Sequence, residues 1–137
     1  MTKRILVIDD EDGVREIVKI CLEATTNWEI LTACSGPEGI EIALSEHPDA
    51  ILLDVMMPSM DGPTTFKQLQ TIAATCDIPT IFLTAKAQRS EQQRFRDLGV
   101  AGIITKPFLP ETLAIDICKT LNWNDKTYMN ANQDFCT

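Results

Sequence analysis

Five short apolar runs recur along the chain, and a stretch with apolar residues at helical spacing follows each of them. The runs are residues 5–8, 28–33, 50–53, 81–83 and 102–105. Most of them lack the alternation of polar and apolar residues that a half-solvated strand has, so we expect strands buried on both faces. Buried strands joined by helices predict an α/β fold, an open doubly wound parallel sheet with helices on both faces.

The stretches between these runs predict five helices. Their apolar positions fall at Val14 to Leu22, Ile40 to Leu44, Phe66 to Ala73, residues 89–98 and Leu113 to Leu121. Ser35 is a suitable cap for the second helix, and Pro37 suits its first turn. Residues 123–137 are polar and aperiodic, which predicts a tail rather than a second domain.

Charge and size exclude several classes of function. The chain has 137 residues, which fits one domain, and its 12 Lys+Arg against 20 Asp+Glu leave a net charge of −8. Nucleic acids and anionic membranes would be repelled by this charge. No apolar run approaches the roughly 18 residues that a membrane helix needs. Five cysteines without a C-x-x-C pair, beside the single His47, favour buried free thiols and a surface histidine in a cytoplasmic protein.

Polar side chains follow four of the five predicted strands. They are Asp9, Asp10 and Glu11 after the first strand, Asp54 after the third, Thr84 after the fourth and Lys106 after the fifth. Because the carboxyl ends of parallel strands share one edge of the sheet, we expect these side chains to converge. Carboxylates held together repel one another unless a cation joins them, so the sequence predicts a cation site at this edge.

The residue types at this edge suit magnesium and phosphoryl chemistry. Mg²⁺ prefers hard oxygen ligands and often shares a phosphate with the protein. Asp54 is the central carboxylate, and carboxylates are known to accept phosphoryl groups covalently. Lys106 and Thr84 would contact other oxygens of such a group. The residues therefore predict an aspartyl-phosphate site that uses Mg²⁺, with solvated loop ends as the alternative.

Four motifs at these strand ends resemble one known family. They are residues 8–11 (IDDE), 53–62 (LDVMMPSMDG), 83–85 (LTA) and 105–108 (TKPF). In this order they are similar to the receiver domain of two-component response regulators, most of all to the stand-alone, chemotaxis-type members. The resemblance covers about residues 4–121. It implies a flavodoxin-like sheet with strand order 2-1-3-4-5, a receiver domain over residues 1–122, and a tail over 123–137 with no output domain.

The resemblance also implies a role for each motif residue. Asp54 would be the phosphorylation site, and Mg²⁺ would be held by Asp9 (mostly through water), Asp10, Asp54 and the backbone carbonyl of Met56. Thr84 would turn toward the phosphoryl group, Lys106 would contact it, and the Lys106–Pro107 bond would be cis. The phosphoryl donor would be a sensor histidine kinase or phosphotransfer protein, and output would pass to another protein. Such a chain promotes its own phosphorylation and slow dephosphorylation without being a turnover enzyme.

Three other functions could use a similar set of residues. A haloacid-dehalogenase-type phosphatase needs a proton-transferring carboxylate at the position of Met56, which cannot transfer a proton. A nucleotide-binding domain needs glycines where this chain has Asp9, Asp10 and Glu11. A receiver fold that works without phosphorylation remains the alternative. The chain departs from the family at Ile103, where an aromatic residue is expected, which puts the aromatic part of the family's switch in doubt.

Overall fold

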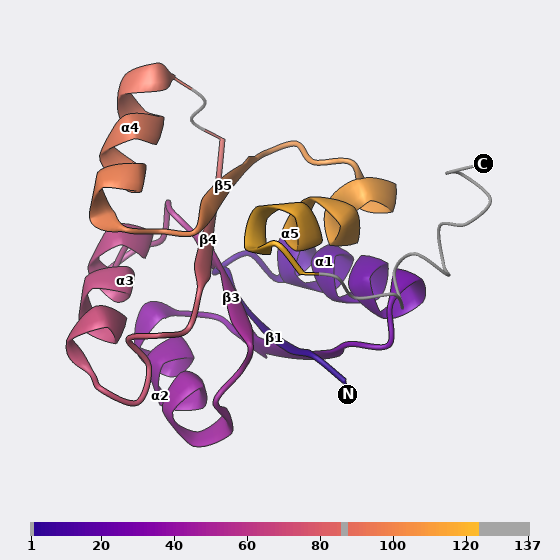
Figure 1. Cartoon of the computed structure of the whole chain (residues 1–137), viewed down its shortest axis with the longest axis horizontal. Coiled ribbons are helices and arrows are strands. Elements are labelled where there is room, and N and C mark those ends of the chain that lie inside the picture. The colour runs from indigo at the N-terminus through magenta and orange to yellow at the C-terminus, as the bar shows by residue number, and fades with distance from the viewer. Residues whose placement is uncertain (1, 86–87, 124–137) are drawn as a thin grey trace.

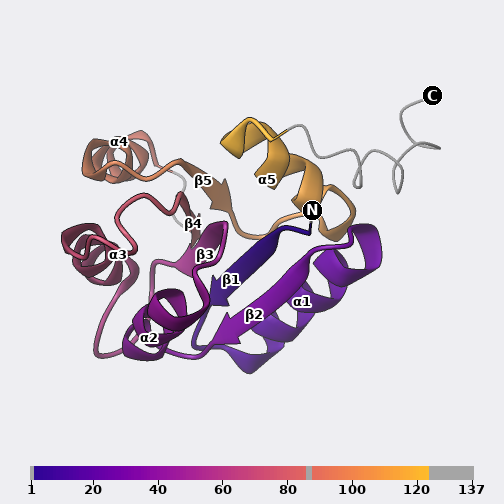
Figure 2. The same ribbon diagram turned by 60° about the horizontal axis from the view of Figure 1, so that its bottom comes forward.

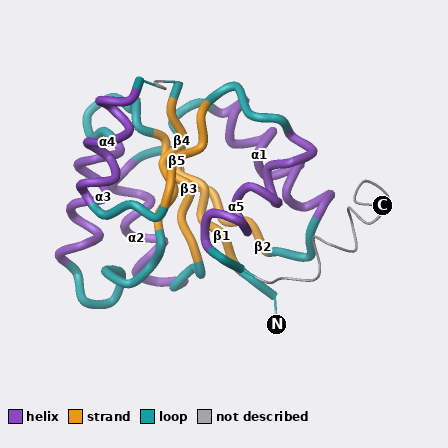
Figure 3. Tube along the Cα trace, turned by 45° about the horizontal axis from the view of Figure 1, so that its top comes forward, coloured by secondary structure: helices purple, strands orange, loops and turns teal. Residues whose placement is uncertain are grey.

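The computed structural model describes residues 2–85 and 88–123 and contains one parallel sheet at its centre (Figure 3). Its strands stand in the order β2-β1-β3-β4-β5, which confirms the expected doubly wound topology. The strands are β1 (Arg4–Ile8), β2 (Glu29–Ala33), β3 (Ala50–Asp54), β4 (Thr80–Thr84) and β5 (Gly102–Thr105).

Helices cover both faces of this sheet. On one face lie α1 (Asp12–Thr25) and α5 (Leu113–Leu121), which follows a short 3₁₀ turn at Pro110–Thr112 (Figures 1 and 2). On the other face lie α2 (Gly36–Glu46), α3 (Gly62–Thr71) and α4 (Arg89–Leu98). The central strands β1, β3 and β4 are therefore shielded from water on both sides, as their unbroken apolar sequences require, whereas β2 and β5 at the edges keep exposed or half-buried residues.

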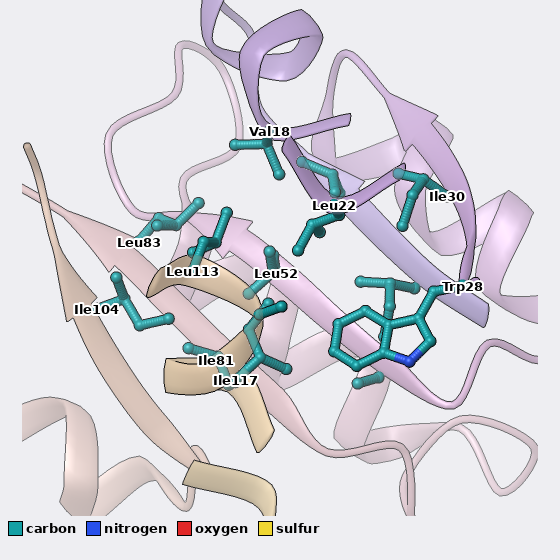
Figure 4. Close-up of a cluster of buried hydrophobic side chains, with 14 of the residues drawn as sticks. Val18, Leu22, Trp28, Ile30, Leu52, Ile81, Leu83, Ile104, Leu113 and Ile117 are labelled. Atoms are coloured by element: carbon teal, nitrogen blue, oxygen red, sulfur yellow. The ribbon is translucent and has the colours of Figure 1, made fainter. Parts of the chain in front are cut away.

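A separate apolar core fills each side of the sheet. Between the sheet and the α1–α5 layer, aliphatic side chains of all five strands meet Val18, Leu22 and Ile117 (Figure 4). On the opposite side three phenylalanines pack edge to face, with the ring centroid of Phe82 5.9 Å from that of Phe66 and 5.1 Å from that of Phe95. Every residue of β3 and β4 is buried, so the strand ends are held by a rigid support.

The winding direction of the chain reverses at the centre of the sheet. From β1 the chain crosses by α1 to β2 at one edge, whereas from β2 it returns by α2 to β3 on the other side of β1. The loops that leave β1 and β3 therefore diverge above their carboxyl ends, and a crevice opens at such a point in an open α/β sheet. This crevice is where the sequence places Asp9, Asp10 and Asp54.

Local sequence signals determine where α2 and α3 begin. The predicted Ser35 cap is confirmed, because its hydroxyl accepts a hydrogen bond from the Glu38 amide at 3.2 Å. At α3 the Asp61 carboxylate accepts one from the Thr64 amide at 2.9 Å. Gly62 then passes close to β3, where a Cβ atom would stand only 2.6 Å from the Asp54 carbonyl oxygen. The start of α3 is thus pressed against the end of β3.

One expected helix ends early, and one apolar helical position is exposed. The third helix ends at Thr71 instead of continuing through Ala73. The Leu69 carbonyl there accepts from the Ile72 amide at 3.3 Å and from the Thr75 hydroxyl at 2.7 Å instead of from a further helical amide. Ile17 belongs to the predicted apolar stripe of α1, yet its side chain is 51% exposed. The apolar positions from Val14 to Leu22 extend over more than two turns of α1, and a position at the edge of such a stripe faces solvent.

The cysteines only partly match the expected buried thiols. Cys118 is buried, Cys21 and Cys76 are half-buried, and Cys34 is exposed, all without disulfides. The fifth cysteine, Cys136, lies outside the described residues. His47 is exposed at the end of α2, as expected for a surface histidine.

The expected tail, residues 123–137, is described at Trp123 only, and the remainder lies outside the described residues. The Trp123 ring packs edge-on against Trp28 with the centroids 5.6 Å apart, and the Lys3 ammonium lies 4.7 Å from its centroid. Among the described helices, none has the length and apolar character needed to cross a membrane.

Candidate functional site

The strand ends bring three carboxylates together. One carboxylate oxygen each from Asp9, Asp10 and Asp54 lies within 4.8 Å of the other two. Asp9 and Asp10 leave the end of β1, and Asp54 is the last residue of the adjacent β3. Parallel pairing of these two strands, with Ile8 opposite Leu53, fixes the carboxylates side by side. The acidic cluster expected from the sequence is therefore present.

Lys106 supplies the positive charge of the cluster. Its ammonium donates to Asp54 Oδ1 at 3.1 Å and to Asp9 Oδ2 at 3.3 Å. The backbone around it is also fixed, because the Lys106 amide donates to the Thr84 carbonyl at 2.8 Å and the Lys106–Pro107 bond is cis, as expected. One ammonium against three carboxylates leaves the cluster with an excess of negative charge.

The cluster leaves one buried oxygen without a partner. Both carboxylate oxygens of Asp9 accept hydrogen bonds, Oδ1 from the Glu11 amide at 2.9 Å and Oδ2 from the Lys106 ammonium. Asp10 Oδ1, by contrast, is buried and has no hydrogen-bond partner among the described residues. Buried polar oxygens are seldom left unpaired. A hard divalent cation held by oxygen ligands is the partner that fits this oxygen and the excess charge.

The electrostatics of Asp54 reflect its position. Its side chain is only 4% exposed, and this burial, followed by the charge of Asp9, raises the pKa of Asp54 to about 6 despite the hydrogen bond from Lys106. Burial alone would lower the pKa of Lys106, but the hydrogen bond to Asp54 and the charge of Asp9 outweigh it and raise that pKa. At neutral pH the chemistry available here is therefore that of an ionised carboxylate beside an ammonium.

Thr84 and Met56 stand beside this cluster in different surroundings. Thr84 ends β4, is fully buried and pairs in register with Thr105 of β5. The Met56 side chain, two residues beyond Asp54, is 61% exposed over the loop after β3. Met57 is buried instead and packs in the core on the side of the sheet covered by α2 and α3. The structure thus places each residue of the predicted site at the same edge of the sheet.

One side chain at this edge was missed by the sequence analysis. Arg15, on α1, donates from Nη1 to the backbone carbonyl of Asp9 at 2.7 Å. A search limited to strand ends cannot find it, because its Cα lies within a helix and only the long side chain returns to the site. The available signal was its spacing from Asp9, since a residue in the first turns of α1 is within reach of the strand end.

The comparisons with known proteins agree with this geometry. A family model described as the response regulator receiver domain matches residues 5–117. The probable transcriptional regulator ycf27 of Porphyridium aerugineum is 35% identical over 130 residues, which cover 95% of this chain and 52% of the relative. The alkaline phosphatase synthesis transcriptional regulatory protein PhoP of Bacillus subtilis is 37% identical, over 80% of this chain and 45% of its own length. The chain spans about half the length of these curated relatives.

Solved structures match over nearly their whole length. The chemotaxis response regulator CheY4 of Vibrio cholerae superposes with a TM-score of 0.82 at 28% identity, covering 88% of this chain and 99% of CheY4. A second structure, the receiver domain of the Francisella response regulator 1452, has a TM-score of 0.80 at 24% identity and covers 90% of this chain. The sheet order and the helix layers are thus those of CheY-like domains.

Proposed function

Because the chain belongs to the response regulator receiver domain family, we propose that Asp54 is its phosphoryl acceptor. Members of this family act as phosphorylation-dependent switches in two-component signalling, not as turnover enzymes, and they generally bind Mg²⁺. The single observation that carries the proposal is the contact between the Lys106 ammonium and Asp54 Oδ1, inside a cluster that also holds an unpaired Asp10 oxygen. A buried carboxylate beside an ammonium and a possible cation ligand can accept a phosphoryl group, because both positive charges would neutralise the phosphoryl oxygens.

The chemistry at Asp54 is nucleophilic. An oxygen of the ionised carboxylate attacks the phosphorus of a phosphorylated donor, so the new P–O bond forms as the bond to the donor breaks. The Lys106 ammonium, 3.1 Å from Asp54 Oδ1, is placed to pair with an oxygen of the arriving phosphoryl group. The Thr84 hydroxyl is proposed to turn toward another. Neither residue exchanges a proton with the acceptor in this scheme.

A divalent ion supplies charge neutralisation when it is bound. The residues proposed to hold Mg²⁺ are Asp10 and Asp54 directly, the Met56 backbone carbonyl, and Asp9 mostly through water. The unpaired Asp10 Oδ1 and the close spacing of the three carboxylates support this ligand set. An all-oxygen set with one or two direct carboxylates is what Mg²⁺ accepts in proteins.

The partners are proposed from the family and from charge. A sensor histidine kinase or a phosphotransfer protein donates the phosphoryl group, and the output is a contact with another protein in the cytoplasm. Several curated relatives are named as transcriptional regulators, but they are about twice as long as this chain. We propose no direct nucleic-acid or membrane partner, because the net charge of −8 opposes both.

Labelling with a small-molecule donor separates this function from a receiver fold that works without phosphorylation. Incubation with acetyl phosphate and Mg²⁺ is expected to add one phosphoryl group per chain, as measured by intact mass. Chelation of Mg²⁺ should suppress the uptake strongly, and brief alkali should remove the label because an acyl phosphate is a mixed anhydride. A folded chain that takes up no phosphoryl group with Mg²⁺ present would instead support the phosphorylation-independent module.

The switch is expected to depend on Thr84 rather than on an aromatic side chain. Ile103 stands half-buried on β5 and packs against the core beneath α4; it is stiff at its first side-chain torsion and has no hydroxyl. We expect Thr84→Ala to accept phosphate but to lose the amide shift changes that a beryllium fluoride mimic produces in α4 and β5.

Ile103→Val is the matched control for this experiment. It removes one methylene, costs about 1 kcal/mol of stability, and should keep the shift changes. If the mimic changes the amide shifts only of the neighbours of Asp54 in the unmodified chain, and those of α4 and β5 stay unchanged, the proposed route of the switch is wrong.

A further inference from the structure

The guanidinium of Arg15 joins the start of α1 to the acidic cluster. Nη1 donates to the Asp9 carbonyl oxygen at 2.7 Å, and Nη2 pairs with the Asp12 carboxylate. The side chain is 18% exposed, whereas Asp12 is almost wholly exposed. The bond to the Asp9 carbonyl is therefore the sheltered one, and the bond to Asp12 faces water, where an ion pair contributes little.

The oxygen that Arg15 holds belongs to the peptide unit between Asp9 and Asp10. A peptide unit is planar, so fixing its oxygen fixes the plane and the direction in which the chain enters Asp10. The next peptide unit, between Asp10 and Glu11, is held separately, because the Glu11 amide donates to Asp9 Oδ1 at 2.9 Å. The buried Asp10 Oδ1 has no partner among the described residues. The carboxylate of Asp9 is held separately by Glu11 and Lys106. The Arg15 contact thus fixes the peptide unit on the amino side of Asp10, and the Glu11 contact fixes the one on its carboxyl side.

Charge alone predicts the opposite effect on a bound cation. Arg15 adds a positive charge beside the cluster in which a metal ion would sit, and two cations repel each other. A purely electrostatic account therefore says that removing Arg15 strengthens cation binding. An account based on position says that removing it weakens cation binding. The two accounts differ in sign, so a measurement can separate them.

We propose that Arg15 is a positioning residue of the phosphorylation site, which holds the Asp9–Asp10 peptide so that the Asp10 carboxylate is oriented for a divalent cation. This inference rests on the proposed function of the site. The residue touches neither the phosphoryl group nor the metal. It acts on Asp10 through the backbone, as outer contacts of metal ligands commonly do.

Arg15→Met tests the proposal, and Arg94→Met is its matched control. Both arginines form ion pairs with a carboxylate three residues earlier on a helix, Asp12 for Arg15 and Glu91 for Arg94. Among the described contacts, only that of Arg15 also reaches the site. Methionine keeps the apolar stem and removes the donors. We expect calorimetric titration to give a Kd for Mg²⁺ that rises roughly tenfold for Arg15→Met and stays unchanged for Arg94→Met.

Two further measurements identify the contact responsible. Asp12→Asn removes the exposed ion pair but leaves the bond to the Asp9 carbonyl, so its Kd for Mg²⁺ should equal that of the unmodified chain. Without any metal, the amide resonance of Asp10 should move in Arg15→Met and stay in place in Asp12→Asn. The metal-free spectra also establish that each variant is folded, independently of labelling.

The outcomes that overturn the inference differ from those that overturn the proposed function. An unchanged or lower Kd in Arg15→Met rejects the positioning role, as does an equal weakening in Asp12→Asn. An unmodified chain that binds Mg²⁺ yet takes up no label rejects the proposed function alone. An unmodified chain that binds no Mg²⁺ rejects both.

Discussion

Asp54→Asn is expected to abolish phosphoryl uptake altogether. An amide offers no anionic oxygen to attack phosphorus, and Lys106 loses the charged partner that it contacts at 3.1 Å. Intact mass after incubation with acetyl phosphate and Mg²⁺ should give only the unmodified chain. The substitution is isosteric, so loss of label reports the chemistry and not a change in packing.

Asp61→Asn is the matched control for this loss. It makes the same chemical change seven residues further on, at the cap of α3, where asparagine caps as well as aspartate does. The label should be retained in full. A base-stable label in the unmodified chain, or labelling of Asp54→Asn to the same extent, would contradict the assignment of Asp54.

The same Asp54→Asn variant is expected to be more stable than the unmodified chain at pH 7 without Mg²⁺. The pKa of Asp54 is raised from 3.8 to about 6 on folding, so between these values the folded state binds more protons than the unfolded state. Stability is therefore lost as pH rises through this window, by up to about 3 kcal/mol for a shift of this size. A neutral asparagine avoids that loss.

Chemical unfolding at two pH values measures this effect. At pH 7 the free energy of unfolding of Asp54→Asn should exceed that of the unmodified chain by about 2–3 kcal/mol, and near pH 4 the difference should have largely disappeared. Asp61→Asn should give no such gain, because hydrogen bonds from Thr64 lower the pKa of Asp61 and favour its ionised form. An equal gain at both pH values would show that packing, not ionisation of Asp54, is the cause.

The parts of the fold that follow from periodicity were predictable. A short unbroken apolar run such as residues 50–53 is typical of a strand buried on both faces, and helices must then cover both faces. Parallel strands place their carboxyl ends together, so Asp54 and Lys106 could be expected at one edge although they are 52 residues apart. Cap residues such as Asp61 are also visible in sequence, because one side chain bonds to the nearby backbone.

Contacts made by a long side chain or by a turn hydroxyl could not be predicted. Arg15 reads as an ordinary polar residue of α1, and only the path of its side chain brings it to Asp9. The end of α3 depends on the Thr75 hydroxyl, whose partner is known only once the turn is formed. The 51% exposure of Ile17 depends on how α1 is rotated about its axis against the sheet. The apolar stripe indicates which side of the helix faces the sheet, but not which residues at the edge of that stripe are buried.

The contact between Trp28 and Trp123 has a practical consequence for spectroscopy. The chain contains two tryptophans, and they pack together where Trp28 precedes β2, at the amino edge of the sheet. The cluster at the carboxyl edge lies about 16 Å away along a five-residue strand. Intrinsic tryptophan emission should therefore change when this aromatic pair separates on unfolding, and it should not change when Mg²⁺ binds. A fluorescence measurement of Mg²⁺ binding thus needs a fluorophore introduced beside Asp54.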